Sequence, residues 1–371
     1  MNSAVAPVQE ARIESVDVSA YEVPTATEEE SDGTLVWSST TIVVVELCCG
    51  EHTGLGYTYC HPSAGQVIET KLASVLEEAD PLMPQQAWAE MQMQARQLGH
   101  AGIAAMAISA VDVALWDLKA KLLGLCLADL LPRYRERVPV YGSGGFCNLS
   151  EQELREQVES WIGDGFRSIK IKVGRDAKAD PARVSFVKEI AGPEVEVMVD
   201  ANGANNAQEA VGWAQRYAGL GVTYFEEPVS SQDVSGLAYV RERAQPPLAV
   251  AAGEYGWNLP YFQSLLDADA VHILQADVTR CGGITNMLRV DGLCQARNLP
   301  FSAHCAPAIS AHVCCAMESV IHLEYFFDHY RIESMLFEGT LDPSGGLLEP
   351  DRSRPGLGLE LKRAEARRYQ L

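Results

Sequence analysis

The chain is poor in positive charge, and its first residues carry no long hydrophobic run. Of its 371 residues, 29 are Lys or Arg and 50 are Asp or Glu, so the formal net charge is -21. Such a charge repels nucleic-acid phosphates and anionic lipid surfaces, so we expect no nucleic-acid partner and no membrane partner. The start, MNSAVAPVQEARIESV, lacks a basic segment followed by an apolar run of signal-peptide length. By default we therefore expect a cytoplasmic protein.

Two further signals are missing. No C-x-x-C spacing occurs among the ten cysteines, so we expect reduced thiols that fill space, with neither a disulfide framework nor a cysteine metal site. The most apolar long window, 103–118, is rich in alanine and carries Asp112 and Asp117. This pattern indicates a buried helix and not a membrane span.

The first third of the chain has strand patterns followed by helical ones. Residues 12–23 and 40–48 are predicted to form antiparallel strands, joined by an acidic, glycine-containing loop that includes 28–34. A second loop is predicted at 54–61, before about seventy residues of helical pattern. Strands followed by helices indicate an α+β domain, which we assign to residues 1–135.

From Val138 onward, short apolar strands alternate with segments of helix length. The spacing of about 20 to 30 residues is typical of strand-helix units in a parallel sheet. The predicted strands are 138–141, 168–173, 195–199, 222–225, 248–251, 271–274, 300–303 and 322–326. Because no Gly-rich dinucleotide turn opens the series, we predict a closed barrel and not an open sheet.

The expected fold is therefore α/β: a modified TIM barrel of the (β/α)7β type with an α+β capping domain. The barrel is assigned to residues 136–345, and its first helix is predicted to begin with a capping box at Ser150–Glu153. No full helix is expected after the eighth strand. Residues 346–371 are expected to form a tail that returns to the capping domain.

Three acids close successive strands of the predicted barrel, namely Asp200, Glu226 and Glu254. Active sites of such barrels lie at the C-terminal ends of the strands, so these side chains are expected to meet. Crowded carboxylates repel one another, and an all-oxygen set without His or Cys selects Mg²⁺ or a similar hard cation. Glu227 competes with Glu226 for this role, but strand alternation places the two on opposite faces.

Lys170 and Lys172 lie two residues apart on the second strand, so both side chains point to one side. Two close ammonium groups disfavour one another's protonation. We therefore expect at least one lysine to have a lowered pKa that suits a general base.

Asp277 and His304 follow the sixth and seventh strands and are expected to form a pair. The carboxylate would fix the imidazole tautomer and give a second proton-transfer group that faces Lys172. Glu324, on the eighth strand, is expected to donate a hydrogen bond to an oxygen of a bound acid if burial keeps it protonated. Such a site suits removal of the proton α to a carboxylate, because the resulting dianion needs a cation and strong donors.

Together these residues resemble the enolase superfamily and, within it, the mandelate racemase subgroup. The motifs that carry the resemblance are K-x-K at Lys170–Lys172, D-x-N at Asp200–Asn202, EEP at Glu226–Pro228, G-E at Gly253–Glu254, Asp277, His304 and Glu324. The resemblance implies three acidic metal ligands, two bases and a small-molecule carboxylate substrate. It also implies a homo-oligomer and capping-domain loops that close over the substrate.

In this resemblance Lys170 modulates the base Lys172, and Asp277 supports the base His304. Asn202 stands where some sugar-acid dehydratases of the superfamily carry His, which weakens the likeness to those enzymes. The first capping loop is acidic, which disfavours a substrate with a phenyl group. The candidate substrate-binding residues are Trp37, Tyr57, Tyr59 and Asn202.

We predict dehydration of a polyhydroxy (sugar) acid to a 2-keto-3-deoxy acid. Lys172 or His304 would take the α-proton, and an acid such as His304 would protonate the departing β-hydroxyl. A racemase or epimerase of a 2-hydroxy acid would use the same two bases, so the sequence leaves this alternative open. A silent relative that binds without reacting is a third possibility, although no ligand or base is missing.

Overall fold

The protein is described by a computed structural model that covers residues 11–371. The first ten residues, on which the expectation of a cytoplasmic protein partly rests, lie outside the described chain. The described part opens with a three-stranded antiparallel sheet in the order β1-β4-β5. These strands are β1 (Ser15–Pro24), β4 (Ser39–Cys49) and β5 (His52–Tyr59). The predicted acidic loop contains a small hairpin, β2 (Glu30–Ser31) with β3 (Val36–Trp37).

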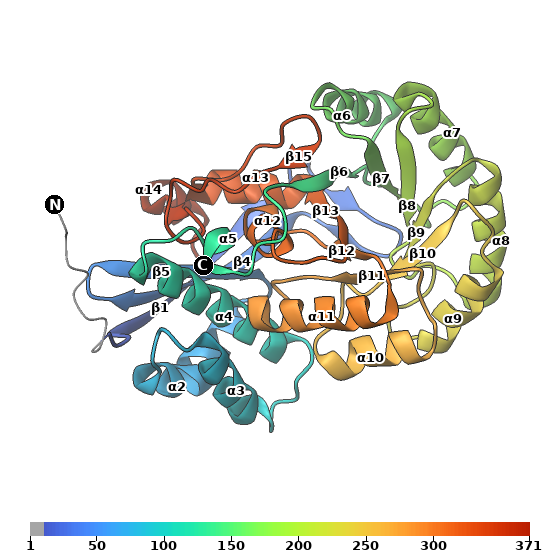
Figure 1. Cartoon of the computed structure of the whole chain (residues 1–371). Coiled ribbons are helices and arrows are strands. Elements are labelled where there is room, and N and C mark those ends of the chain that lie inside the picture. The colour runs from blue at the N-terminus through green and yellow to red at the C-terminus, as the bar shows by residue number, and fades with distance from the viewer. Residues whose placement is uncertain (1–10) are drawn as a thin grey trace.

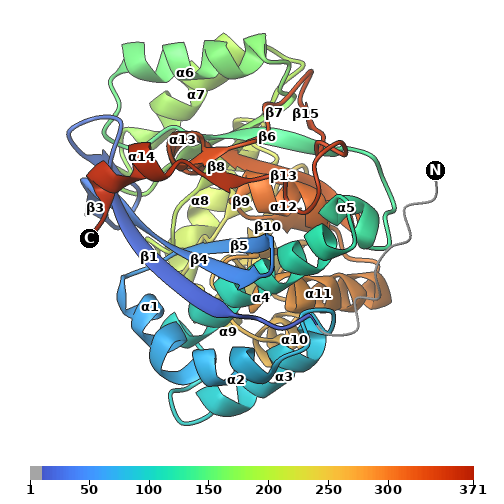
Figure 2. The ribbon, with the colours of Figure 1, turned by 90° about the vertical axis from the view of Figure 1, so that its left-hand side faces the viewer.

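Helices complete the capping domain and lie beside this sheet (Figure 2). They are α1 (Ser63–Val67), a π-helical turn (Ile68–Leu72), α2 (Ala73–Glu78), α3 (Pro84–Ala95), α4 (Ile103–Leu122) and α5 (Leu127–Leu130). The alanine-rich α4 is buried along most of its length and packs on β4 and β5. The predicted loop at 54–61 is wrong over most of its length, because β5 runs through it to Tyr59. Its glycines let the strand lie against α4 and do not make a turn.

Gly56 shows how closely β5 lies on α4. A Cβ at this position would come within 2.1 Å of the Ala110 carbonyl oxygen and 2.6 Å of the Ala114 nitrogen, so the backbone itself would have to move. We expect Gly56→Ala to lower the free energy of unfolding by about 1–3 kcal/mol or more, the usual cost of overpacking. Denaturant unfolding of the purified variant measures this loss.

Gly212 provides the control for that substitution. It lies within α8 (Ala207–Gly219), and a Cβ there would meet nothing within 4 Å. Gly212→Ala is therefore expected to leave stability unchanged or to raise it by up to about 1 kcal/mol through helix propensity. Equal stability of Gly56→Ala and the unmodified protein would contradict the close packing of β5 on α4.

Eight parallel strands close into a barrel after the capping domain (Figure 1). Consecutive strands pair with one another, and the last strand pairs with the first. The strands are β6 (Val138–Gly144), β7 (Ser168–Lys172), β8 (Glu196–Asp200), β9 (Tyr224–Glu226), β10 (Ala249–Ala252), β11 (Ile273–Ala276), β12 (Phe301–Ala303) and β13 (Val320–Phe326). All eight predicted strands are present, and the closure confirms a barrel in place of an open sheet.

Helices surround the strands and bury the outer face of the barrel (Figure 1). Besides α8 they are α6 (Glu151–Gly163), α7 (Asp180–Ala191), α9 (Val234–Arg243), α10 (Leu259–Asp267), α11 (Gly283–Arg297) and α12 (Pro307–Cys314). The predicted capping box is confirmed, since Ser150 and Glu153 exchange backbone and side-chain hydrogen bonds at the start of α6. A separate apolar cluster draws one residue from each of five strands, namely Tyr141, Met198, Tyr224, Ala251 and Ile273.

A ten-residue helix, α13 (Phe327–Leu336), follows the last barrel strand. The expectation that no full helix follows this strand is therefore wrong. Three of the buried residues of α13 are the polar Asp328, His329 and Glu333, so the apolar periodicity of the segment is weak. Two of these polar groups are bound by the capping domain, because the Tyr57 hydroxyl donates to Glu333 at 2.5 Å and the Thr40 hydroxyl donates to Asp328 at 2.8 Å.

The C-terminal tail returns to the capping domain, as predicted. The strand β16 (Glu360–Leu361) pairs with β14 (Phe337–Glu338), and β15 (Leu347–Leu348) pairs antiparallel with β6. After the short helix α14 (Arg363–Ala366), the backbone of Leu371 donates to Ala20 of β1 at 3.0 Å. The exact limits assigned to the domains stay predictions. Within residues 11–371, no helix has the length and apolar character needed to cross a membrane.

Candidate active site

The C-terminal ends of seven neighbouring strands carry buried ionisable side chains. These are Lys170 and Lys172 on β7, Asp200 on β8, Glu226 on β9, Glu254 after β10, Asp277 after β11, His304 after β12 and Glu324 on β13. Side chains two residues apart on a strand point to the same side. Asp200 therefore lies on the same face of β8 as Met198, and Glu226 lies on the same face of β9 as Tyr224. Met198 and Tyr224 both belong to the separate apolar cluster. The strand ends thus bring together all the ionisable residues predicted for the site.

A cavity of about 440 Å³ lies between these strand ends and the capping domain. Lys172, Glu254, His304 and Glu324 line it from the barrel. In the closed barrel, β7 and β12 are separated by two strands on one side and by four on the other. Lys172 and His304 therefore reach the cavity from different sides.

Asp200, Glu226 and Glu254 form a compact cluster of carboxylates. One oxygen from each lies within 4.8 Å of the others, and all three side chains are buried. Burial is the main cause that raises the pKa of Glu226 to about 8, with Lys170 acting in the opposite direction. The other oxygen of Glu226, Oε1, is buried without a hydrogen-bond partner. This donor set fits a hard divalent cation, which would supply the charge that these oxygens lack.

The two lysines are ion-paired with acids. Lys170 Nζ lies 2.6 Å from Glu226 and 2.8 Å from Glu324, and Lys172 Nζ lies 2.5 Å from Asp200. Burial opposes both positive charges, but the carboxylates hold the pKa of each lysine above its ordinary value. The predicted lowering of a lysine pKa is therefore not found. Lys170 does lower the pKa of Lys172, as expected, but Asp200 raises it more.

His304 and Asp277 form the predicted pair. His304 Nδ1 lies 2.7 Å from Asp277 Oδ2, and the other carboxylate oxygen accepts hydrogen bonds from the backbone and hydroxyl of Thr279. The imidazole Nε2 lies 2.9 Å from Glu254. Burial opposes a charged imidazolium, but the neighbouring acidic groups, Cys305 first among them, raise the pKa of His304.

Burial does not keep Glu324 protonated, so the condition for its role as a donor is not met. Its Oε1 accepts a hydrogen bond from Ser143 at 2.5 Å and lies 2.8 Å from Lys170 Nζ. Burial favours the neutral acid, but the positive charges of Lys170 and His304 hold the pKa of Glu324 well below its ordinary value. The side chain is therefore a carboxylate and accepts hydrogen bonds, in place of the donor predicted from burial alone.

Three of the four candidate substrate-binding residues line the cavity: Trp37, Tyr59 and Asn202. The Asn202 amide oxygen is buried without a hydrogen-bond partner. Tyr57 is fully buried outside the cavity lining, where its ring stacks on Phe337. Tyr57 and Tyr59 lie on the same face of β5, so strand alternation does not explain why only Tyr59 reaches the cavity. Tyr59 stands at the end of the strand, whereas Tyr57 is kept from the cavity by its packing.

The sequence did not single out Cys305 or His329, which also line the cavity. Cys305 directly follows His304, and its thiol lies 3.3 Å from the imidazole Nε2. The adjacency to a predicted base was a usable signal for Cys305. His329 lies on α13, so the missed helix hid it.

Fold and site together define an enzyme of the enolase superfamily. Residues 20–132 match the family described as mandelate racemase / muconate lactonizing enzyme, N-terminal domain, and residues 153–366 match the enolase C-terminal domain-like family. The chain belongs to this mandelate racemase / muconate lactonizing enzyme family, as the resemblance implied.

Three similar proteins cover almost the whole chain. A 3,6-anhydro-alpha-L-galactonate cycloisomerase from Streptomyces coelicolor is 32% identical and aligns with 95% of this chain and 98% of its own. The crystal structure of a mandelate racemase/muconate lactonizing enzyme-like protein from Rubrobacter xylanophilus is 56% identical, with a TM-score of 0.95 and coverage of 97% and 100%. L-talarate/galactarate dehydratase from Salmonella typhimurium, crystallised with Mg and L-lyxarohydroxamate, is 27% identical, with a TM-score of 0.89 and coverage of 100% and 96%.

Proposed function

We propose that this enzyme removes the proton α to the carboxylate of a small hydroxy acid in a Mg²⁺-dependent reaction. The leading reaction is dehydration of a polyhydroxy (sugar) acid to a 2-keto-3-deoxy acid. The observation that carries the proposal is the position of Lys172 and His304, which line one cavity from different sides beside a cluster of three carboxylates.

Asp200, Glu226 and Glu254 are the proposed ligands of Mg²⁺. When bound, the ion supplies positive charge that stabilises the substrate carboxylate as the α-proton leaves. The presence of magnesium in the crystal of the Salmonella dehydratase supports this choice of ion. Lys170, which does not line the cavity, holds Glu226 and Glu324 by ion pairs and thereby limits the repulsion among the acids.

Lys172 and His304 are the proposed bases. The ion pair with Asp200 retains the proton on Lys172. A cation held by Asp200 would weaken that pair and would favour the neutral lysine that a base requires. Asp277 fixes His304 through Nδ1 at 2.7 Å, which leaves Nε2 for proton transfer. Proton removal by either residue gives the same planar carbanion equivalent, delocalised onto the carboxylate.

Dehydration follows when the substrate carries a β-hydroxyl group. A proton from His304 to that oxygen breaks the C–O bond and releases water, and the enol that remains tautomerises to the 2-keto acid. The geometry of Lys172 and His304 also favours a second candidate, a racemase or epimerase. There one residue removes the α-proton and the other returns one to the opposite face.

Proton NMR in D₂O with Mg²⁺ tests this proposal. Incubation with sugar acids, their lactones and anhydro derivatives, and 2-hydroxy acids is expected to remove the α-proton signal of at least one compound. A new methylene signal marks dehydration, and exchange with an intact skeleton marks racemisation or epimerisation. If Mg²⁺ binds normally and no carboxylate that binds exchanges its α-proton, the proposed proton abstraction is contradicted. That result would favour a silent relative, which binds without reacting.

The finer organisation of the enzyme belongs to the same proposal. We place the working enzyme in the cytoplasm, because ten free thiols suit a reducing compartment. A homo-oligomer is implied by the resemblance, and small carboxylates are its partners in place of nucleic acid or membrane. The capping domain, barrel and tail are assigned to residues up to 135, 136–345 and 346–371.

A further inference from the structure

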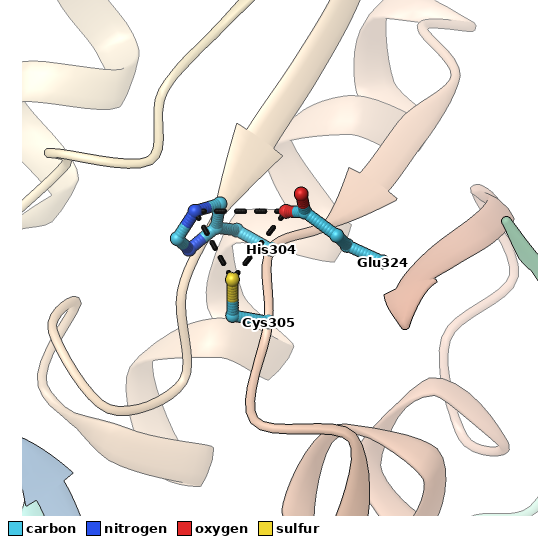
Figure 3. A group of neighbouring side chains, drawn as sticks. All are labelled: His304, Cys305 and Glu324. Atoms are coloured by element: carbon cyan, nitrogen blue, oxygen red, sulfur yellow. Dashed lines mark hydrogen bonds and ion pairs between the residues drawn. The ribbon is translucent and has the colours of Figure 1, made fainter. Parts of the chain in front are cut away.

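Three different ligand atoms meet on the rim of the barrel beside the carboxylate cluster. Figure 3 shows the side chains of His304, Cys305 and Glu324 turned toward one another. Cys305 Sγ lies 3.3 Å from His304 Nε2 and 3.5 Å from Glu324 Oε2, and the last two atoms lie 3.6 Å apart. All three residues are buried, and all three line the cavity.

Neighbouring groups hold these side chains by their other atoms. His304 Nδ1 is bound to Asp277, and Glu324 Oε1 accepts from Ser143 and faces Lys170. A histidine whose second nitrogen is held by a carboxylate is the usual arrangement around a bound zinc ion. Glu254 Oε2, 2.9 Å from His304 Nε2, is the one further acid at this nitrogen among the described residues.

The separations of the three atoms match the edges of a tetrahedral site. Zinc binds nitrogen and oxygen at about 2.0–2.2 Å and thiolate sulfur at about 2.3 Å, so its tetrahedral edges are roughly 3.3–3.6 Å between nitrogen and oxygen and roughly 3.5–3.7 Å to sulfur. The sulfur–oxygen distance of 3.5 Å and the nitrogen–oxygen distance of 3.6 Å fall in these ranges, and the sulfur–nitrogen distance of 3.3 Å is slightly shorter than its edge. A thiolate and an imidazole select zinc-like cations, whereas the oxygen cluster of Asp200, Glu226 and Glu254 selects magnesium.

We propose that His304, Cys305 and Glu324 form a second metal site, specific for a thiophilic divalent cation such as Zn²⁺. On binding, the Cys305 S–H bond and the Nε2–H bond of the charged His304 imidazole break, bonds from sulfur and from Nε2 to the cation form, and both protons are released to solvent. No oxidation state changes. The fourth position of the tetrahedron opens to the cavity, as in zinc sites with three protein ligands.

The site implies that zinc inhibits the enzyme. Coordination occupies the lone pair on Nε2 of His304. Nε2 is the atom that the proposed function uses for proton transfer. This consequence rests on the proposed function, whereas metal binding does not. Enzyme saturated with Mg²⁺ should therefore lose the α-proton exchange that depends on His304 as Zn²⁺ is added.

Cobalt absorption tests the site without any substrate. In the presence of excess Mg²⁺, Co²⁺ is expected to give the intense thiolate-to-cobalt charge-transfer band of a tetrahedral site, and Zn²⁺ is expected to remove it. The band should disappear in Cys305→Ser and persist in Cys60→Ser, the matched control, because Cys60 is the second cysteine of the cavity lining. It should also persist in Glu226→Gln, which weakens the oxygen cluster and leaves all three proposed zinc ligands unsubstituted.

A missing band in the unmodified protein, or an undiminished band in folded Cys305→Ser, would overturn the proposal. Should Cys305→Ser fail to fold, alkylation of the unmodified protein decides the matter, because Zn²⁺ is expected to protect Cys305 but not Cys60 from iodoacetamide in peptide mass spectra. Equal protection or equal labelling of the two cysteines refutes the site.

Inhibition is measured separately, relative to the activity of each variant without zinc. The Zn²⁺ concentration for half-inhibition is expected to rise by about tenfold or more in Cys305→Ser, as when one group around a metal is lost. Zn²⁺ could protect Cys305 from iodoacetamide and remove the cobalt band, yet leave α-proton exchange unchanged. That result would refute the role of His304 as a base but would still support the metal site. The two proposals therefore fail by different observations.

Discussion

Replacing Lys172 by alanine or His304 by asparagine is expected to stop α-proton exchange on opposite faces of the substrate carbon. A positioned general base contributes about 10²–10⁴-fold to the rate, so each variant should lose about that factor for one configuration of the substrate. The reason is geometric, because the two side chains reach the cavity from different sides of the barrel.

The measurement is deuterium incorporation into each epimer or enantiomer of an active compound, followed by proton NMR in D₂O. Lys178→Ala is the matched control, since Lys178 is an exposed lysine that follows the same strand as Lys172, and it should exchange like the unmodified enzyme. Equal losses for both configurations in each single variant would argue for one shared base. Unchanged exchange in both variants would remove the two residues from the mechanism.

The positions of the site residues could be predicted because barrel topology leaves little freedom. Successive parallel strands end at one rim, so an acid at the end of each strand, such as Asp200 or Glu226, must approach its neighbour. The strands themselves carry apolar residues at regular spacing. Sequence alone was therefore sufficient to predict the barrel, the acidic cluster and the pair of Asp277 with His304.

Protonation could not be predicted in the same way. The pKa of Lys172 depends on whether Asp200 or Lys170 lies closer, and a sequence does not give that distance. The ion pair at 2.5 Å decides the direction. Burial alone would keep Glu324 neutral, but Lys170 at 2.8 Å stabilises the carboxylate. Small differences in distance thus reverse an expectation that burial alone suggests.

Local packing explains the remaining differences. Gly54 and Gly56 suggested a turn, yet each lets β5 approach the backbone of α4. The polar residues of α13 obscured a helix because their partners lie on other elements. The sequence predicts Cys305 to be a space-filling thiol, because metal motifs are recognised by cysteine spacing. Its potential partner Glu324 comes from the neighbouring strand, so no spacing within the sequence marks the group.

The largest effect on metal dependence is expected from Glu226→Gln. Saturating Mg²⁺ at about 100 times its dissociation constant stabilises a protein by about 2.7 kcal/mol, so the unmodified enzyme should melt at a higher temperature with Mg²⁺ than with a chelator. The variant loses one charged oxygen ligand and should lose most of this difference. Its α-proton exchange should fall by at least about a hundredfold, since polarisation by a metal is worth several kcal/mol.

Glu227→Gln separates the metal ligand from its neighbour. Glu227 is also buried, but it is not part of the cluster formed by Asp200, Glu226 and Glu254. Its variant should keep the rise in melting temperature with Mg²⁺, because the three clustered oxygens remain. The reverse result, with the rise lost in Glu227→Gln and kept in Glu226→Gln, would assign the ligand to Glu227. In that case the positive backbone φ of 36° at Glu227 would be the feature that turns its side chain toward the ion.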